Sequence, residues 1–168
     1  QGKLEEAEVL YRRALKGSER VLGLDHPDTL ISVNNLGSLL KDQGKLEEAE
    51  VLSRRALEGR ERVLGVDHPE TLSSVSRMGL LLYSQGKLDE AEPLFRRALE
   101  GYERMLGVEH RNTINSRGNL GLLLMKRGDD ESGGQEMVRD VLSSLLSPPH
   151  SLVEAHSWIK KFRRALEL

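Results

Sequence analysis

Three polar side chains occupy equivalent positions of an internal repeat in this chain and could together hold a peptide. They are Asn35, Arg77 and Asn119. An asparagine amide can donate hydrogen bonds to a peptide backbone and accept them from it, and an arginine guanidinium can bind a carboxylate through two parallel N–H bonds. If the three residues share one face of the fold, they form a ladder that can bind the backbone and the acidic side chains of an extended peptide.

The internal repeat keeps one scaffold and varies one face. Residues 1–42 and 43–84 are identical at 30 of 42 positions, and six of the twelve differences fall at residues 31, 34, 35, 38, 41 and 42 and their counterparts. At about 100° per residue, this spacing places all six on one arc of about 120° of a helix. A constant scaffold with one variable stripe predicts a binding surface.

The candidate ligand contacts are the residues of this stripe in three successive repeats. We predict peptide contacts from Asn34, Asn35, Ser38, Lys41, Ser73, Arg77, Leu80, Tyr83, Asn115, Asn119, Leu122 and Lys126. The same stripes also contain Ile31, Asp42, Ser76, Ser84, Gly118 and Met125. The alternative is that these side chains drift freely in solvent, and that Leu80 and Leu122 pack between neighbouring helices.

Histidines also recur once per repeat, which is a pattern that a metal site could produce. His26, His68 and His110 occupy equivalent turns, so we expect them to lie about 10 Å apart, the distance between packed helices. A zinc ion needs its ligands within about 2.1 Å, so we interpret the three as turn residues. His150 and His156 lack partners at ligand spacing. The sequence therefore predicts no metal site and no cofactor.

Paired charges recur on the second helix of each repeat. Glu47-Glu48 and Asp89-Glu90 suit the positive end of a helix dipole better than they suit general acid–base catalysis. The arginine pairs, such as Arg54-Arg55, have acidic neighbours, which favours a solvated, salt-bridged surface over a basic ridge. The chain contains no phosphate-binding loop, nucleophile motif or zinc signature. We therefore expect a protein that is not an enzyme.

Helices must position all of these residues, and each repeat contains two. The first begins after His-Pro-Asp or His-Pro-Glu, where proline suits the first turn, and ends at Gln-Gly, where glycine suits the left-handed C-terminal position. The predicted helices span about 3–22, 27–43, 45–64, 69–85, 87–106, 111–127, 130–146 and 150–167. A fixed repeat period built from antiparallel helix pairs predicts an all-α fold of the α-solenoid type.

The repeat resembles the tetratricopeptide repeat (TPR). Its pattern is matched by Leu36-Gly37, Leu40, Ala49 and Ala56, and in the next copy by Met78-Gly79, Leu82, Ala91, Phe95 and Ala98. The length of one full copy, which spans residues 43–84, and segments such as Gln43-Gly44-Lys45 make it similar to the kinesin light chain subtype. The resemblance implies a right-handed superhelix whose first helices line a concave groove. It also implies a ligand class, because kinesin light chain binds short peptides rich in tryptophan and acidic residues.

The repeat boundaries imply one array over residues 1–168. We expect residues 1–23 to be the second helix of a preceding repeat, residues 24–65, 66–107 and 108–147 to be repeats, and residues 148–168 to be a capping helix that carries Trp158 and Phe162. The last repeat has Gly133 and Asp140 in place of alanine, and we expect Gly133-Gly134 to interrupt its second helix. Because the chain opens on a second helix, we expect a longer array or a processed form.

Composition narrows the choice of partners. Charged residues make up 31% of the chain and balance to a net charge of −2, which favours neither nucleic acid nor an anionic membrane. The sequence has no apolar run of the ~20 residues that a transmembrane helix needs, and its lack of cysteine fits a reducing compartment. We expect a cytoplasmic scaffold for a protein or peptide. The alternative is a structural or regulatory segment that acts by autoinhibition of a flanking domain or by self-association, as a homo-oligomer through Leu4, Ala7 and Tyr11.

Overall fold

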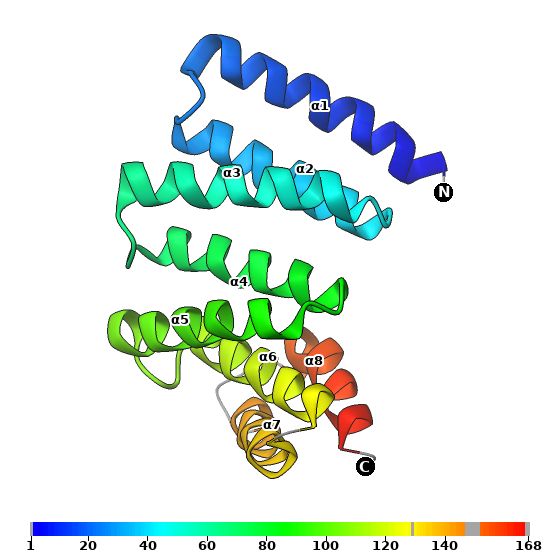
Figure 1. The fold of residues 1–168 in the computed structure, drawn as a ribbon, viewed down its shortest axis with the longest axis vertical. Helices are drawn as coiled ribbons and strands as arrows, with labels where there is room; N and C mark the ends of the chain where they lie inside the picture. The colour runs from blue at the N-terminus through cyan, green and yellow to red at the C-terminus, as the bar shows by residue number, and fades with distance from the viewer. Residues whose placement is uncertain (1, 129, 147–151, 167–168) are drawn as a thin grey trace. The chain divides into compact units, whose positions relative to one another are not determined.

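The computed structural model describes residues 2–128, 130–146 and 152–166, and the residues within these ranges form eight α-helices and no strand (Figure 1). The helices are α1 (Gly2–Leu22), α2 (Pro27–Asp42), α3 (Leu46–Leu64), α4 (Pro69–Ser84), α5 (Leu88–Leu106), α6 (Arg111–Arg127), α7 (Glu131–Leu146) and α8 (Leu152–Ala165). The prediction of an all-α fold is confirmed. In the described part of the chain, no helix is both long enough and apolar enough to cross a membrane.

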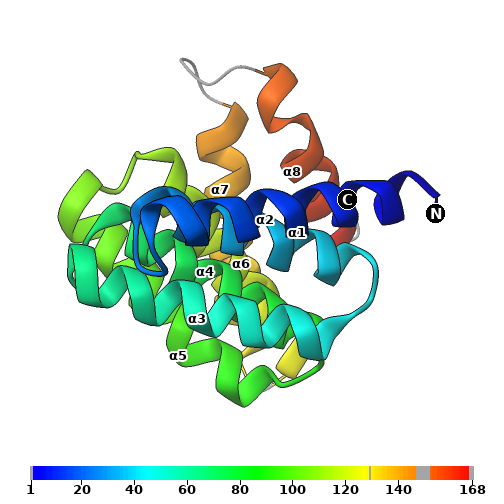
Figure 2. The same cartoon turned by 90° about the horizontal axis from the view of Figure 1, so that it is seen from above.

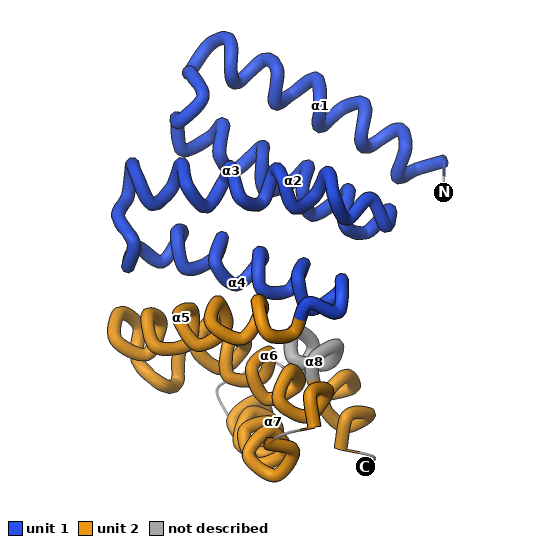
Figure 3. The backbone as a smooth tube through the Cα atoms, viewed as in Figure 1, with its two compact units in different colours: residues 1–87 blue, residues 88–168 orange. Residues whose placement is uncertain are grey.

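The chain divides into two compact units, residues 1–87 and residues 88–168 (Figure 3). In unit 1, α1 packs against α2, α2 against α3, and α3 against α4. In unit 2, α5 packs against α6, α6 against α7, and α7 against α8. In unit 1, consecutive helices run back and forth across the view of Figure 1, so the unit is built from antiparallel helix pairs, and α1 and α3 run in the same direction in Figure 2.

The histidines begin the first helix of each pair. His26, His68 and His110 are the N-cap residues of α2, α4 and α6, and the Nδ1 atom of each accepts a hydrogen bond from the backbone N–H two residues later, at 3.2, 3.1 and 3.1 Å. This bond satisfies one of the backbone donors that a helix N-terminus leaves unpaired. The three histidines are therefore turn residues, as predicted, and each one caps a helix.

The core of unit 1 is an apolar cluster between α1, α2, α3 and α4. It contains Leu15, Val33, Leu36, Leu40, Ala49, Ala56 and Leu81. Helices α2 and α3 pack together at Gly37: a Cβ atom added there would lie 3.5 Å from the Cβ of Leu52 and 3.7 Å from the carbonyl oxygen of Ala49. These are ordinary van der Waals distances, so the contact is close without being crowded.

The expected interruption at Gly133-Gly134 is wrong, because α7 continues through both residues. The glycines are explained by the approach of α6 and α7. A Cβ atom at Gly134 would lie 2.7 Å from the carbonyl oxygen of Gly121, and one at Gly121 would lie 2.9 Å from the carbonyl oxygen of Gly134. Glycine weakens a helix by about 1 kcal/mol relative to alanine, and here it allows the two backbones to meet.

One glutamate per repeat links successive helix pairs. Glu8, Glu50 and Glu92 each accept hydrogen bonds from the arginine four residues later and from a cation where the first helix of the next pair gives way to the second. The bonds from these cations are Lys45 to Glu8 at 2.7 Å, Lys87 to Glu50 at 3.0 Å, and Arg127 to Glu92. The pairings of Glu8 and Glu50 lie in unit 1, and the pairing of Glu92 lies in unit 2.

These bonds lower the pKa of all three carboxyl groups. Hydrogen bonds from Lys45 and Arg12 lower the pKa of Glu8 to about 2, and hydrogen bonds led by Lys87 lower the pKa of Glu50. At Glu92, burial raises the pKa, but the bonds from Arg96 and Arg127 outweigh it and the net direction is downward. The arginine-rich second helices are therefore salt-bridged surfaces, as the sequence predicts.

Candidate peptide-binding surface

The predicted first-helix stripe lies on α2 and α4 in unit 1 and on α6 in unit 2. In unit 1, Asn35 and Arg77 are exposed, whereas Ser38, Lys41, Ser73, Leu80 and Tyr83 are half-buried. Arg77 Nη1 donates a hydrogen bond of 2.7 Å to Ser38 Oγ, and this bond joins the stripe of α4 to the stripe of α2. The structure thus brings together two of the predicted ligand contacts from different repeats.

Asn34 is the member of the unit 1 stripe that is not open to a ligand. Its exposed fraction is 5%, and its Nδ2 atom donates to Ser74 Oγ at 3.1 Å. Arg60 Nη1 donates to the same Ser74 oxygen at 3.0 Å and to the carbonyl oxygen of Glu70 at 2.9 Å. Asn34 therefore belongs to a buried polar network between α2, α3 and α4, where its hydrogen-bonding capacity is used internally.

The sequence reasoning missed Arg60, although it is a buried cation. Its Nη2 atom forms an ion pair of 3.0 Å with Glu70 at the start of α4, and the Arg60 side chain is 6% exposed. The repeat contains a signal that could have identified Arg60. The equivalent residues of the other copies, Ser18 and Tyr102, are uncharged, so Arg60 is the charged residue at this position. A buried arginine is stable only when it is paired, and the carboxylate and carbonyl of Glu70 supply that pairing.

In unit 2 the stripe is largely covered. Asn119 is 4% exposed and Leu122 is 8% exposed, while Asn115 is half-buried and Lys126 is exposed. Leu122 belongs to an apolar cluster with residues of α7 and with Phe162 of α8. Leu122 is therefore a buried packing residue, but its described neighbours are on the C-terminal helices and not on a neighbouring first helix, where the alternative placed them.

The open part of the stripe in unit 1 has a positive balance of charge. It carries the exposed guanidinium of Arg77 and the ammonium of Lys41, whose Nζ atom lies 3.6 Å from Asp42 Oδ1. Burial raises the pKa of Tyr83, whose phenol is protonated at neutral pH with or without this shift. This set of donors and cations can bind carbonyl and carboxylate oxygens.

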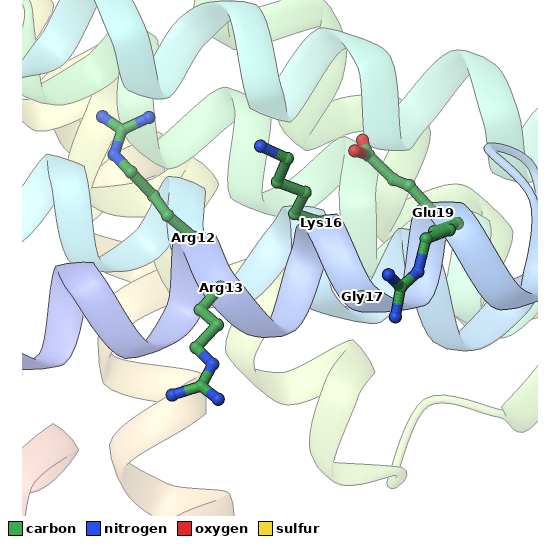
Figure 4. A pocket seen from close by; sticks show the side chains of 6 residues that line it. Arg12, Arg13, Lys16, Gly17 and Glu19 are labelled. Atoms are coloured by element: carbon green, nitrogen blue, oxygen red, sulfur yellow. The ribbon is translucent and has the colours of Figure 1, made fainter.

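A shallow hollow on α1 is a second candidate, and its geometry is unsuitable for an anion. It is lined by Arg12, Arg13, Lys16, Gly17, Glu19 and Arg20. Figure 4 shows Arg12 and Lys16 pointing away from Arg13, so the cations do not converge on one point. Arg12 also donates to Glu48 of α3 at 2.7 Å. In addition, no cluster of three metal-ligating side chains occurs within the ranges that the structure describes.

Comparison with known proteins identifies the repeat. The model of one protein family, the tetratricopeptide repeat, matches residues 1–62, 32–104 and 72–132. None of the curated proteins compared with the sequence matches it.

Several solved structures share the fold over 99% of this chain. BtubC (BKLC) from P. vanneervenii is 20% identical with a TM-score of 0.76, and the match covers 67% of that chain. A putative kinesin light chain from P. anserina with nearly identical TPR-like repeats is 21% identical with a TM-score of 0.76, and 80% of that chain is covered. A variant of the latter is 22% identical with a TM-score of 0.77. At these identities the likeness concerns the fold, which is an α-solenoid of helix pairs.

Proposed function

Because the chain belongs to the tetratricopeptide repeat family, whose members are generally non-catalytic scaffolds for protein interactions, we propose that it binds an extended, acidic peptide along α2 and α4. The observation that carries the proposal is the repeat itself. Two copies that are identical at 30 of 42 positions differ along one face of the first helix, and in unit 1 that face presents Asn35 and Arg77 to solvent. When the side chains that differ between repeats lie on one face of a scaffold, that face can determine which ligand the scaffold binds.

The chemistry of the ligand follows from the open donors. Arg77 gives one N–H bond to the neutral hydroxyl of Ser38, and a guanidinium has five N–H donors, so others are free to meet a carboxylate. Asn35 can pair with the backbone amides of an extended chain, while Leu80 and Tyr83 provide apolar contact beside it. The same ligand class, acidic with an aromatic residue, is implied by the resemblance to kinesin light chain. We propose that Asn115, Asn119, Leu122 and Lys126 of unit 2 do not belong to this site in the conformation seen.

Further parts of the proposal concern what the chain does not do. The stripe offers groups that bind a peptide, so we propose a scaffold that has no enzymatic activity, needs no cofactor and acts in the cytoplasm without binding nucleic acid or membrane. The lack of cysteine supports a reducing compartment.

A peptide-display screen against the whole chain, followed by hydrogen exchange of the complex, tests the proposed site. The best acidic peptide should slow exchange in residues 27–42 and 69–84, because binding stabilises the helices that it contacts. Residues 46–64 of α3 serve as the internal control and should change least. Protection centred on α3 or α5 would show that the ligand binds elsewhere.

Self-association is a second candidate function, favoured by the surface of α1. Leu10 is 64% exposed and Tyr11 is 40% exposed, whereas the α3 counterpart of Tyr11, Ser53, is 8% exposed. The first half of α1 is acidic and its second half is basic, so two antiparallel copies would place opposite charges against each other around Tyr11. Sedimentation should show a dimer that Tyr11→Asp disrupts. A wild-type chain that remains strictly monomeric at high concentration would refute it.

A further inference from the structure

The C-terminal helix α8 contacts the stripe of α6 through the aromatic ring of Phe162. Phe162 is completely buried. It belongs to an apolar cluster formed with α6 and α7, whose other members are Ile114, Leu122, Val138, Val141, Leu142 and Leu145. Ile159, Ala165 and Leu166 pack at the edge of the same cluster. Among the side chains described, Ile159, Phe162 and Ala165 of α8 and Leu166 just after its end follow the spacing i, i+3, i+6 and i+7, which is one face of a helix.

A glycine of the stripe makes room for this ring. A Cβ atom built on Gly118 would lie 2.3 Å from Cζ and 2.9 Å from Cε1 of Phe162, so any side chain there would collide with the ring. The counterparts of Gly118 in the two preceding repeats are Asn34 and Ser76. The third repeat therefore has no side chain at this position of the variable face, and the ring of Phe162 occupies the space. We call this space the Gly118 socket.

We propose that α6 and α7 form a docking site for an amphipathic helix with a phenylalanine anchor, and that α8 is its resident, displaceable occupant. The partner is a helix with a phenylalanine that fits the Gly118 socket and aliphatic residues three positions before it and three to four positions after it. This is the helix-in-groove mode of recognition. The site lies in unit 2, and its ligand is a helix, so it is separate from the extended-peptide site proposed for unit 1.

The way in which α8 is held explains why a partner can displace it. Among residues 159–166, Phe162 is the one that is fully buried, and Lys160, Lys161, Arg163 and Arg164 are exposed. A helix of 14 residues is close to the length at which isolated helices are marginal, so the cost of ordering α8 opposes its docking. A tethered occupant of this kind reduces the apparent affinity of any external ligand by the fraction of time that it fills the site.

The α8 sequence itself is the probe that tests this inference. A fluorescein-labelled peptide of residues 152–168 is titrated into the wild-type chain and into the Phe162→Ala chain, with anisotropy as the readout. The Phe162→Ala chain should bind the peptide at least tenfold more tightly than wild type does, because its own helix no longer holds the socket. The same peptide carrying Phe162→Ala should bind neither chain measurably.

A second substitution tests whether the ring enters the socket at Gly118. Gly118→Leu, added to the Phe162→Ala chain, should abolish binding because the leucine side chain fills the socket. Circular dichroism confirms that each chain is folded, and the milder Phe162→Leu chain replaces Phe162→Ala if the latter loses its helices. Equal binding to wild type and to the anchor variant, no binding to a folded anchor variant, or persistent binding after Gly118→Leu would each overturn the inference. None of these outcomes bears on the unit 1 site, which the hydrogen-exchange experiment tests separately.

Discussion

Replacing each of two glycines at equivalent repeat positions with alanine should change the free energy of unfolding in opposite directions. Gly37 of α2 and Gly121 of α6 lie two repeat periods apart, and each faces the second helix of its own pair. Alanine improves the intrinsic helix propensity of either site by about 1 kcal/mol. The packing of the added methyl group therefore decides the sign of the change.

The distances around each glycine set the expected magnitude. At Gly37 the added Cβ would have its nearest neighbours at 3.5 Å, so nothing must move, and we expect a net gain of about 0.5–1 kcal/mol. At Gly121 it would lie 2.9 Å from the carbonyl oxygen of Gly134 and 3.0 Å from Cγ2 of Val138. Because the oxygen is backbone and cannot rotate away, α6 and α7 must separate, and we expect the overpacking to cost about 2–3 kcal/mol, the upper part of its usual range. The propensity gain only partly offsets this cost, so we expect Gly121→Ala to destabilise the chain by about 1–2 kcal/mol.

Thermal unfolding of the two variants, followed by circular dichroism, measures this difference. For a chain of this size, 1 kcal/mol shifts Tm by about 2–4 °C. Gly37→Ala should therefore raise Tm by about 1–4 °C, and Gly121→Ala should lower it by about 2–8 °C. A rise of Tm in both variants would mean that propensity alone decides and that the close approach of α6 and α7 is not as described.

Two further variants probe the polar interactions. Glu8→Gln should lower Tm at pH 7 but not near pH 2: the pKa of Glu8 is lowered from 4.5 to about 2, so its stabilisation is complete above pH 4.5 and disappears as the pH falls through 2. A gap in Tm that is the same at pH 7 and pH 2 would contradict this. Arg60→Ala should cost about 2–3 kcal/mol, since it removes charged hydrogen bonds from a buried network, whereas the exposed Arg54→Ala should cost less than about 0.5 kcal/mol. Urea unfolding measures the loss in free energy of unfolding for both variants. Equal losses would show that the buried Arg60 network stabilises the fold no more than an exposed ion pair does.

The helices and the family were predictable from the sequence because local signals recur in every repeat. Proline after histidine begins α2 and α4, glycine with positive φ follows α2, α4 and α6, and the predicted ends agree with the structure to within about two residues. The TPR resemblance, of kinesin light chain type in fold, is confirmed by the family match over residues 1–132 and by the solved structures.

The candidate site was less predictable because exposure depends on neighbours that periodicity does not specify. Asn34 is on the stripe, yet Ser74 and Arg60 from other helices bury it. Leu122 belongs to a cluster that includes Phe162 of α8, a helix that lies outside the predicted repeats and so has no counterpart to guide its placement. The side chain of Trp158, named with Phe162 in the predicted cap, lies outside the described residues.

The central claim is that unit 1 binds an acidic peptide through Arg77, and one pair of affinities tests it most directly. The best acidic peptide from the display screen is titrated against Arg77→Glu and against Arg62→Glu, which makes the same charge change at an exposed position on α3 whose ion pair with Asp25 is itself exposed. Charge-assisted hydrogen bonds contribute about 1.5–3 kcal/mol, so Arg77→Glu should raise Kd by about tenfold or more. Arg62→Glu should change Kd by less than about twofold, since an exposed charge away from the site contributes little. Equal affinities of the two folded variants would contradict the account, and would indicate that the differences between repeats on the stripe have no role in binding.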